Sequence, residues 1–212
     1  MPFDYKKVEK EYYMPKEIPE LVTVPSMNFM AIKGKGNPNT PDGEYKAAVR
    51  LLFNLAYGIK MSQKGDSRIE GFYDYVVPPL EGLWWQENNA EADWEKKENF
   101  CWISLIRLPE FITEPVFSQI KEEMQRKKKQ DYSRVRFLTM EEGLCVQCMH
   151  KGTYDQEIRT LKAIENFIGR EGYVADYSVR RFHHEIYLSL PGRTVPAKQK
   201  TVIRIPVKKE AE

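Results

Sequence analysis

The stretch His183-His184-Glu185-Ile186-Tyr187-Leu188-Ser189-Leu190-Pro191 decides the fold, because its residues alternate in the way that a β-strand requires. Successive residues of a strand face opposite sides of the sheet. One side of this strand can therefore pack against helices through its apolar residues Ile186, Leu188 and Leu190, together with His184. The other side carries an imidazole, a carboxylate, a phenol and a hydroxyl, from His183, Glu185, Tyr187 and Ser189. Such a row of polar groups belongs either to a solvated strand face or to the wall of a ligand pocket.

The segments around this strand follow one plan twice. Hydrophobic spacing and turn residues predict strand, helix, strand and strand in the first half, at residues 27–34, 44–59, 72–86 and 100–108, with a polar hairpin-like connection at 88–98. The strand at 72–86 is interrupted by Pro78-Pro79, which leaves the stretches 72–77 and 80–86. The second half repeats the order at residues 143–152, 155–169, 183–190 and 201–207. A helix from about 113 to 129 and a short strand at 135–138 lie between the halves.

This order predicts an α+β fold made of two strand-helix-strand-strand (βαββ) units related by pseudo-two-fold symmetry. We expect one domain over residues 21–212, with halves at about 21–110 and 131–208 joined by the helix at about 113–129. Helices would cover one face of the strands and leave the other face concave, with a central ligand cleft at the junction of the halves. Residues 1–20 form an N-terminal arm that is expected to dock through aromatic side chains, namely Phe3, Tyr5, Tyr12 and Tyr13.

Composition predicts an ordinary soluble globule. Of the 212 residues, 42% are hydrophobic and 30% are charged, and the net charge is only +2, so there is no overall attraction to nucleic acid or to an anionic membrane. The basic run 126–129 ends a predicted helix, where the helix dipole favours cations. No apolar run reaches the length of a membrane span, and the first residues do not resemble a signal peptide, so we expect a cytoplasmic protein.

No metal or cofactor site is expected. The three cysteines, Cys101, Cys145 and Cys148, have the character of small buried residues in a reducing compartment. His183 and His184 are adjacent on a strand and face opposite ways, so they cannot both bind one metal ion. The sequence contains no phosphate-binding loop, no Gly-x-Ser-x-Gly elbow and no dinucleotide-binding fingerprint.

Three separated motifs resemble the stand-alone GyrI-like small-molecule-binding proteins: Pro79-Leu80-Glu81-Gly82-Leu83-Trp84-Trp85, then the stretch 183–189, then Pro-Ala-Lys-Gln-Lys-Thr-Val-Ile-Arg-Ile-Pro at 196–206. The resemblance covers roughly residues 20–207. It implies a duplicated SHS2-type fold with a central ligand cleft. Related domains form the drug-sensing part of some multidrug-responsive transcription regulators, where a buried Glu faces planar cationic ligands among aromatic rings. The 20 residues before the domain are too few for a helix-turn-helix segment, which argues against direct DNA binding.

The candidate catalytic residues are Glu185, which the resemblance favours, and Tyr187, which lies two residues further on the same strand face. Some stand-alone members of the family are hydrolases that open the strained cyclopropane of DNA-alkylating natural products. Among aromatic rings, Glu185 can deprotonate a water molecule or pair with a ligand cation. The hydroxyl of Tyr187 can donate to a carbonyl oxygen that gains charge as a bond breaks.

The candidate ligand-binding residues are Trp84, Trp85, Trp102, His183 and Glu81. Flat indole rings can sandwich a planar ligand, although each of these rings could equally be an ordinary core residue. Trp84 and Trp85 are adjacent, so only one of them can face a cleft on a regular strand. Glu81 holds a place in the first half that we expect to correspond to that of Glu185, and paired carboxylates would suit acid and base roles.

Two functional hypotheses remain open from the sequence. The first is a hydrolase that opens the ring of cyclopropane-containing DNA-alkylating toxins and so detoxifies them. The second is a non-catalytic, multidrug-type binder or sensor of planar aromatic or cationic small molecules. A protein-interaction module is a weaker third. The sequence does not determine the oligomeric state and is compatible with a monomer.

Overall fold

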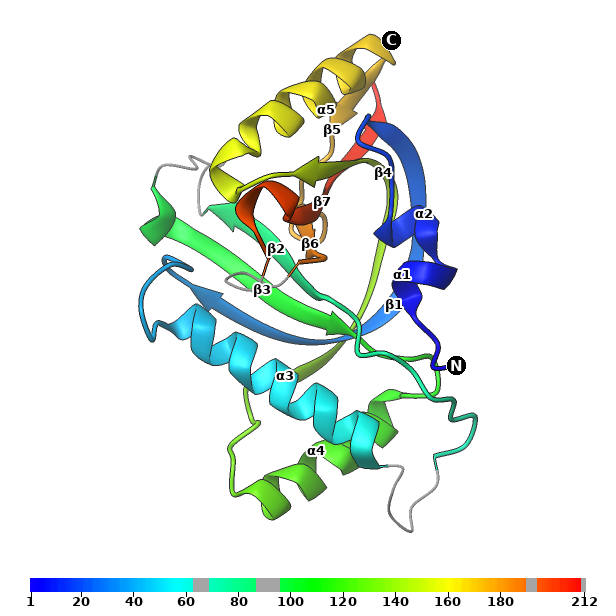
Figure 1. Ribbon diagram of the computed structural model, residues 1–212, viewed down its shortest axis with the longest axis vertical. Coiled ribbons are helices and arrows are strands. Elements are labelled where there is room, and N and C mark those ends of the chain that lie inside the picture. Colours follow the sequence, from blue (N-terminus) through cyan, green and yellow to red (C-terminus); the bar gives the residue numbers. More distant parts are fainter. Residues whose placement is uncertain (63–68, 87–95, 190–193, 211–212) are drawn as a thin grey trace. The chain divides into compact units, whose positions relative to one another are not determined.

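The structure is a computed structural model that describes residues 1–62, 69–86, 96–189 and 194–210 (Figure 1). The chain divides into two compact units. Unit 1 consists of Met1–Asp4, Met27–Pro78 and Gln86–Met140, and unit 2 consists of Tyr5–Ser26, Pro79–Trp85 and Glu141–Glu212. These units do not coincide with the two halves of the sequence, because a strand of the first half, near Trp84, groups with the second half.

The predicted α+β class and the repeated βαββ order are confirmed. The first set is β1 (Glu20–Lys35), α3 (Glu44–Ser62), β2 (Leu80–Gln86) and β3 (Phe100–Arg107). The second set is β4 (Arg136–Lys151), α5 (Ile158–Arg170), β6 (His183–Tyr187) and β7 (Lys200–Lys209). The helix α4 (Glu114–Lys128) separates the two sets, with Thr113 at its N-cap and a proline in its first turn.

Several predicted elements differ in detail. The predicted strands at 135–138 and 143–152 are one strand, because Gly143 adopts a positive φ of 66° that lets β4 continue through it. Residues 72–77 are not a strand, because their only described β-partner is Phe3, which forms an isolated bridge with Tyr75. The short strand β5 (Tyr173–Ala175) was not predicted. Most of the predicted connection at 88–98 lies outside the described residues, which resume at 96.

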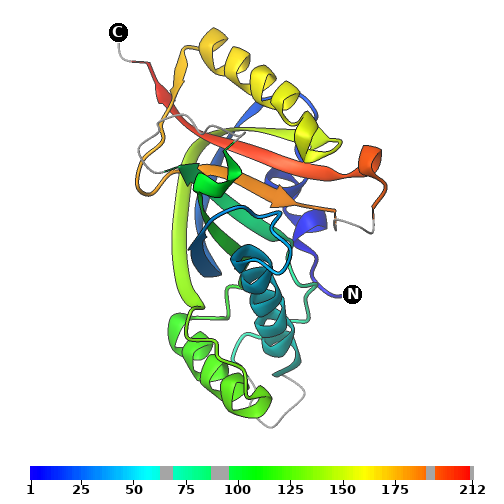
Figure 2. The ribbon, with the colours of Figure 1, turned by 90° about the vertical axis from the view of Figure 1, so that its left-hand side faces the viewer.

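Unit 1 contains a strand pair and two helices. β1 and β3 pair in antiparallel fashion, from Phe29 opposite Arg107 to Lys35 opposite Cys101. Helix α3 packs against β3, and α4 lies beside α3 (Figures 1 and 2). The apolar residues of α4 that were predicted to point inward, Phe117, Ile120 and Met124, are buried.

Unit 2 contains the sheet that carries the quoted stretch. Strand β7 pairs with β4, with β6 and with β5, and β6 pairs in turn with β2, all in antiparallel fashion. In this register Glu185 lies opposite Ile203 of β7 and opposite Gly82 of β2. Its neighbour His184 lies opposite Arg204 and Leu83. Because directly paired residues share a side, the register assigns each side chain to one side of the sheet.

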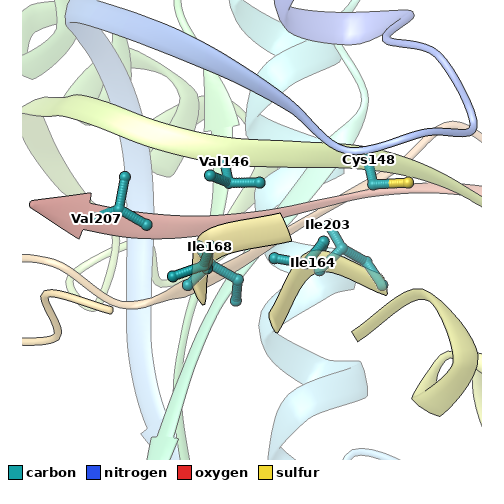
Figure 3. Close-up of a cluster of buried hydrophobic side chains, with 7 residues drawn as sticks. Val146, Cys148, Ile164, Ile168, Ile203 and Val207 are labelled. Atoms are coloured by element: carbon teal, nitrogen blue, oxygen red, sulfur yellow. The ribbon is translucent and has the colours of Figure 1, made fainter. Parts of the chain in front are cut away.

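Helix α5 packs on one side of this sheet. Its buried Ile164 and Ile168 contact a cluster contributed by β4 and β7 (Figure 3): Val146, Cys148, Ile203, Ile205 and Val207. Since Ile203 belongs to this cluster and lies opposite Glu185, the helix-bearing side is the side of Glu185. The expectation that Glu185 lies on the face that helices leave free is therefore wrong for unit 2. Alternation shows which residues share a side, but not which side the helix covers.

The opposite side of the sheet holds the N-terminal segment. It forms two short helices, α1 (Tyr5–Val8) and α2 (Lys10–Tyr13), in unit 2. Tyr5 and Tyr13 are buried, as expected for an arm that docks through aromatic side chains, and Tyr12 is half-buried. The backbone carbonyl of Lys16 accepts a hydrogen bond from Met149 of β4, which ties the segment to the sheet.

Candidate functional site

Glu185 is the centre of a buried polar cluster in unit 2, where it is only 5% exposed. The Oε1 atom of its carboxylate lies 3.0 Å from Nε2 of His183. The Oε2 atom accepts a hydrogen bond of 2.8 Å from the hydroxyl of Tyr187. Three residues that alternate along β6 therefore meet on one side of the sheet, and both carboxylate oxygens are held in place.

Trp84 joins this cluster from the neighbouring strand. Its Nε1 donates a hydrogen bond of 2.9 Å to the hydroxyl oxygen of Tyr187, so a chain of donors runs from Trp84 through Tyr187 to Glu185. Of the two adjacent tryptophans, Trp84 is thus the one on the side of Glu185. Trp85 faces the other side, where its ring packs on Phe182 with the ring centres 4.7 Å apart.

Gly82 makes room for this arrangement. It lies directly opposite Glu185, and a Cβ atom at this position would be 2.6 Å from Nε1 of Trp84 and 2.9 Å from the hydroxyl of Tyr187. Any side chain there would push apart the two groups that form the hydrogen bond. The glycine is therefore needed for the close approach of the two side chains, and not for an unusual backbone conformation.

Tyr154 is a member of the cluster that sequence reasoning missed. It begins a single 3₁₀ turn, η2 (Tyr154–Gln156), and its ring meets that of Tyr187 edge-on with the centres 5.9 Å apart. Burial raises the pKa of its hydroxyl, and the nearby charge of Glu185 raises it further. A tyrosine in a short connection has no periodic pattern that would reveal such a contact, so only the fold could place it.

A second buried polar cluster lies on the opposite side of the same strand. Nδ1 of His184 lies 2.9 Å from Oε2 of Glu142, and Nε2 of His184 lies 3.0 Å from Oε2 of Glu81. The contact between Nε2 of His184 and Oε2 of Glu81 has the length of an ion pair, but its geometry is not that of a hydrogen bond. Arg204 completes the cluster with a bond of 2.6 Å from Nη1 to Oε1 of Glu142. Four ionisable side chains are thus buried together.

Opposite charges stabilise the ionised forms in this second cluster. Burial alone would lower the pKa of His184, but the carboxylates of Glu142 and Glu81 outweigh it and raise the pKa to about 9. Burial alone would raise the pKa of Glu142, but His184 and Arg204 outweigh it and lower the pKa to about 2. At neutral pH His184 is therefore a cation between two carboxylates.

Glu81 does not form a pair with Glu185. It lies opposite Ile186, which is on the side of His184, and it accepts a hydrogen bond of 3.3 Å from the hydroxyl of Tyr13. The two carboxylates therefore face opposite sides of the sheet, so they cannot share acid and base roles at one site.

Trp102 lies in unit 1, where it is fully buried. Its ring covers Gly34 on the paired strand, since a Cβ atom there would come within 2.4 Å of ring atoms, and it meets Tyr45 of α3 edge-on.

Two members of the second cluster, Glu142 and Arg204, were not predicted. Arg204 did give a signal, because it is a lone charge within the apolar run Val202-Ile203-Arg204-Ile205.

A buried carboxylate held among aromatic rings, on the repeated βαββ order of elements, is the arrangement expected of a protein that binds small molecules. Residues 18–208 match the family model described as the GyrI-like small molecule binding domain, and the chain belongs to the GyrI-like family. A comparison with curated proteins found no match. Among the helices that the structure describes, none is long and apolar enough to cross a membrane.

Solved structures support this assignment. A hydrolase from Listeria innocua is 43% identical, with a TM-score of 0.86, over 97% of this chain and 100% of that chain. An uncharacterized conserved protein from Listeria innocua is 44% identical, with a TM-score of 0.91, over 97% and 100% of the two chains. The C-terminal domain of EcmrR is 14% identical, with a TM-score of 0.56, over 90% and 97%, and shares the fold.

Proposed function

We propose that this protein is a hydrolase in which Glu185 activates a water molecule, and that its substrates are planar toxins that carry a cyclopropane conjugated with a carbonyl group. The observation that carries the proposal is the buried carboxylate of Glu185, held by His183 and Tyr187. The 43% identity with a protein described as a hydrolase from Listeria innocua supports the reaction type. The resemblance to ring-opening members of the family supports the substrate class.

The proposed reaction adds one water molecule to the substrate. Glu185 accepts a proton from water as the water oxygen attacks a cyclopropane carbon. The carbon–carbon bond of the three-membered ring breaks, and its electron pair moves into the conjugated carbonyl, whose oxygen becomes an oxyanion. The proton that Glu185 took from water is then passed to that oxygen, which regenerates the carboxylate, so the product is an alcohol and is heavier than the substrate by one water.

Tyr187 can serve this reaction through a change of hydrogen-bond partner. In the structure its proton is directed at Glu185, while Trp84 donates to its oxygen. The bond from Trp84 polarises the hydroxyl and makes it a stronger donor. When Tyr187 turns its proton to the substrate oxygen, it stabilises the developing charge and leaves Oε2 of Glu185 free to accept from water.

Mass analysis after incubation with a cyclopropane-bearing alkylator tests the proposal. The wild-type protein is expected to convert the compound to a product that is heavier by one water, and Glu185→Gln is expected to lose this conversion. Glu165→Gln, which removes an exposed carboxylate on α5, is the matched control and keeps it. A wild-type protein without turnover, whose Glu185→Gln variant binds planar cations more weakly, would identify a non-catalytic binder instead.

A further inference from the structure

The side chains around Glu185 differ sharply in exposure. His183, Glu185 and Trp84 are each about 5% exposed or less, and Tyr187 is half-buried, whereas Tyr154 is 42% exposed. The ring of Tyr154 nevertheless meets that of Tyr187, whose hydroxyl is bonded to Glu185. Among the described residues of this cluster, Tyr154 therefore presents the largest aromatic surface to anything that approaches the carboxylate.

The turn that carries Tyr154 is anchored by a buried histidine that the proposed reaction does not use. Nε2 of His150 lies 3.0 Å from the carbonyl oxygen of Thr153, and because a carbonyl only accepts, Nε2 is the donor. Nδ1 of His150 makes a second hydrogen bond, of 2.9 Å, with the hydroxyl of Thr160 on α5. The imidazole of His150, on β4, is thus hydrogen-bonded both to the residue before η2 and to helix α5.

A second device fixes the same turn. The side chain of Thr153 accepts from the backbone of Gln156, and the side chain of Gln156 accepts from the backbone of Thr153, which forms a capping box around Tyr154. Gly152, at φ 134°, precedes it, and a Cβ atom there would lie 2.4 Å from Oε1 of Gln156. The backbone on both sides of Tyr154 is thus held by hydrogen bonds, which fixes the place of its ring beside Tyr187.

We infer that Tyr154 is a ligand-contacting residue that selects planar aromatic ligands, and that His150 is the positioning residue that holds it. The inference rests on the proposed role of Glu185 as the centre of the ligand site. A phenol ring set edge-on to Tyr187 offers its remaining surface for stacking. The negative charge of Glu185 behind it favours neutral or cationic rings over anionic ones. The ligand class is therefore a planar, neutral or cationic aromatic compound.

Equilibrium binding of two cations to the full-length protein tests this. Ethidium is a planar aromatic cation, and tetrabutylammonium is an aliphatic cation without a ring. Tyr154→Ala is expected to weaken ethidium binding by about 3- to 10-fold, the value of one aromatic contact, and to leave tetrabutylammonium binding unchanged. Tyr154→Phe keeps wild-type affinity for both. Tyr177→Ala removes an equally exposed tyrosine, 44% against 42%, and is the matched control.

The outcomes separate this inference from the proposed hydrolysis. If the wild-type protein turns nothing over, the two affinities still decide the role of Tyr154. Unchanged ethidium affinity in Tyr154→Ala overturns the inference, even where Glu185→Gln abolishes turnover. If turnover is seen, Tyr154→Ala raises KM with kcat nearly unchanged.

The positioning role of His150 has its own readout. Thr160→Val removes one of the two hydrogen bonds of His150 with little change in volume and leaves the imidazole itself in place. It is expected to reduce the preference for ethidium over tetrabutylammonium in the same direction as Tyr154→Ala. A lower melting temperature with an unchanged preference would show that His150 only supports the fold.

Discussion

Glu185 and His184 are consecutive residues of β6, yet their side chains belong to two separate buried clusters on opposite sides of the sheet. Glu185 lies among aromatic rings and a neutral hydroxyl, whereas His184 lies between two carboxylates beside Arg204. Strand β6 thus carries Glu185, which is proposed to activate water, next to His184, which forms ion pairs inside the protein.

Stability should depend on pH through the cluster of His184. Its folded pKa of about 9 exceeds the ordinary 6.5, so its contribution is complete below pH 6.5 and is lost as pH rises through 9. The folded pKa of Glu142, about 2 against an ordinary 4.5, gives a contribution that is lost as pH falls from 4.5 toward 2. Urea unfolding across pH should show the alkaline loss in the wild type and a flatter alkaline limb in His184→Asn. An equal alkaline slope in both proteins would contradict the assignment.

Arg204→Met should release the N-terminal segment. Nη2 of Arg204 donates to the carbonyl oxygen of Tyr12 at 2.9 Å, and the same side chain neutralises Glu142. Loss of one partner of a buried ion pair costs about 3–5 kcal/mol. Hydrogen exchange at Tyr5–Tyr13 should accelerate more than exchange in α5. Arg170→Met, which removes an exposed arginine, is the control and should change the free energy of unfolding by less than about 0.5 kcal/mol.

Gly82→Ala should disturb the Glu185 cluster. The new methyl group would displace Trp84 or Tyr187, because it would lie within 3 Å of both. Overpacking of this kind destabilises by about 1–3 kcal/mol, and the tryptophan fluorescence should change as the indole loses its hydrogen bond. Gly169→Ala on α5 meets no atom within 4 Å and should leave stability equal or raise it by up to about 1 kcal/mol. Equal effects of the two substitutions would refute the close packing around Gly82.

The cysteines should be inert in the native protein. All three are buried, and burial raises the pKa of Cys145 to about 12 and that of Cys148 to about 11. The thiolate is the reactive form, so a thiol reagent at pH 8 should label the native protein slowly and should label three sites after denaturation. Rapid labelling of Cys145 without denaturant would contradict its burial.

Local patterns predicted much of this structure. The alternation from His183 to Tyr187 placed three interacting side chains on one side, because the period of a strand is a property of the chain itself. Helical spacing located α3, α4 and α5 for the same reason. These predictions needed no knowledge of distant segments.

The remaining features depend on contacts between distant segments. The register of β2 against β6 decides that Trp84 joins Glu185 while Glu81 joins His184, and no local pattern contains that register. The packing of α5 decides which side of the sheet is covered. Tyr154 reaches Tyr187 only through the anchored turn at η2. Arg204 could have been noticed as a charge in an apolar strand, but its partners could not.

The hydrogen bond from Trp84 to Tyr187 also has a consequence for folding. The two residues are 103 positions apart, so the cluster of Glu185 cannot exist until the chain has closed a very long loop. Closing such a loop is entropically unfavourable, and contacts of this range form slowly compared with helices. A nascent chain released before β6 would hold Trp84 without its partner. The cluster is therefore complete only after synthesis has passed β6, and any ligand that needs it binds only a chain that contains this strand.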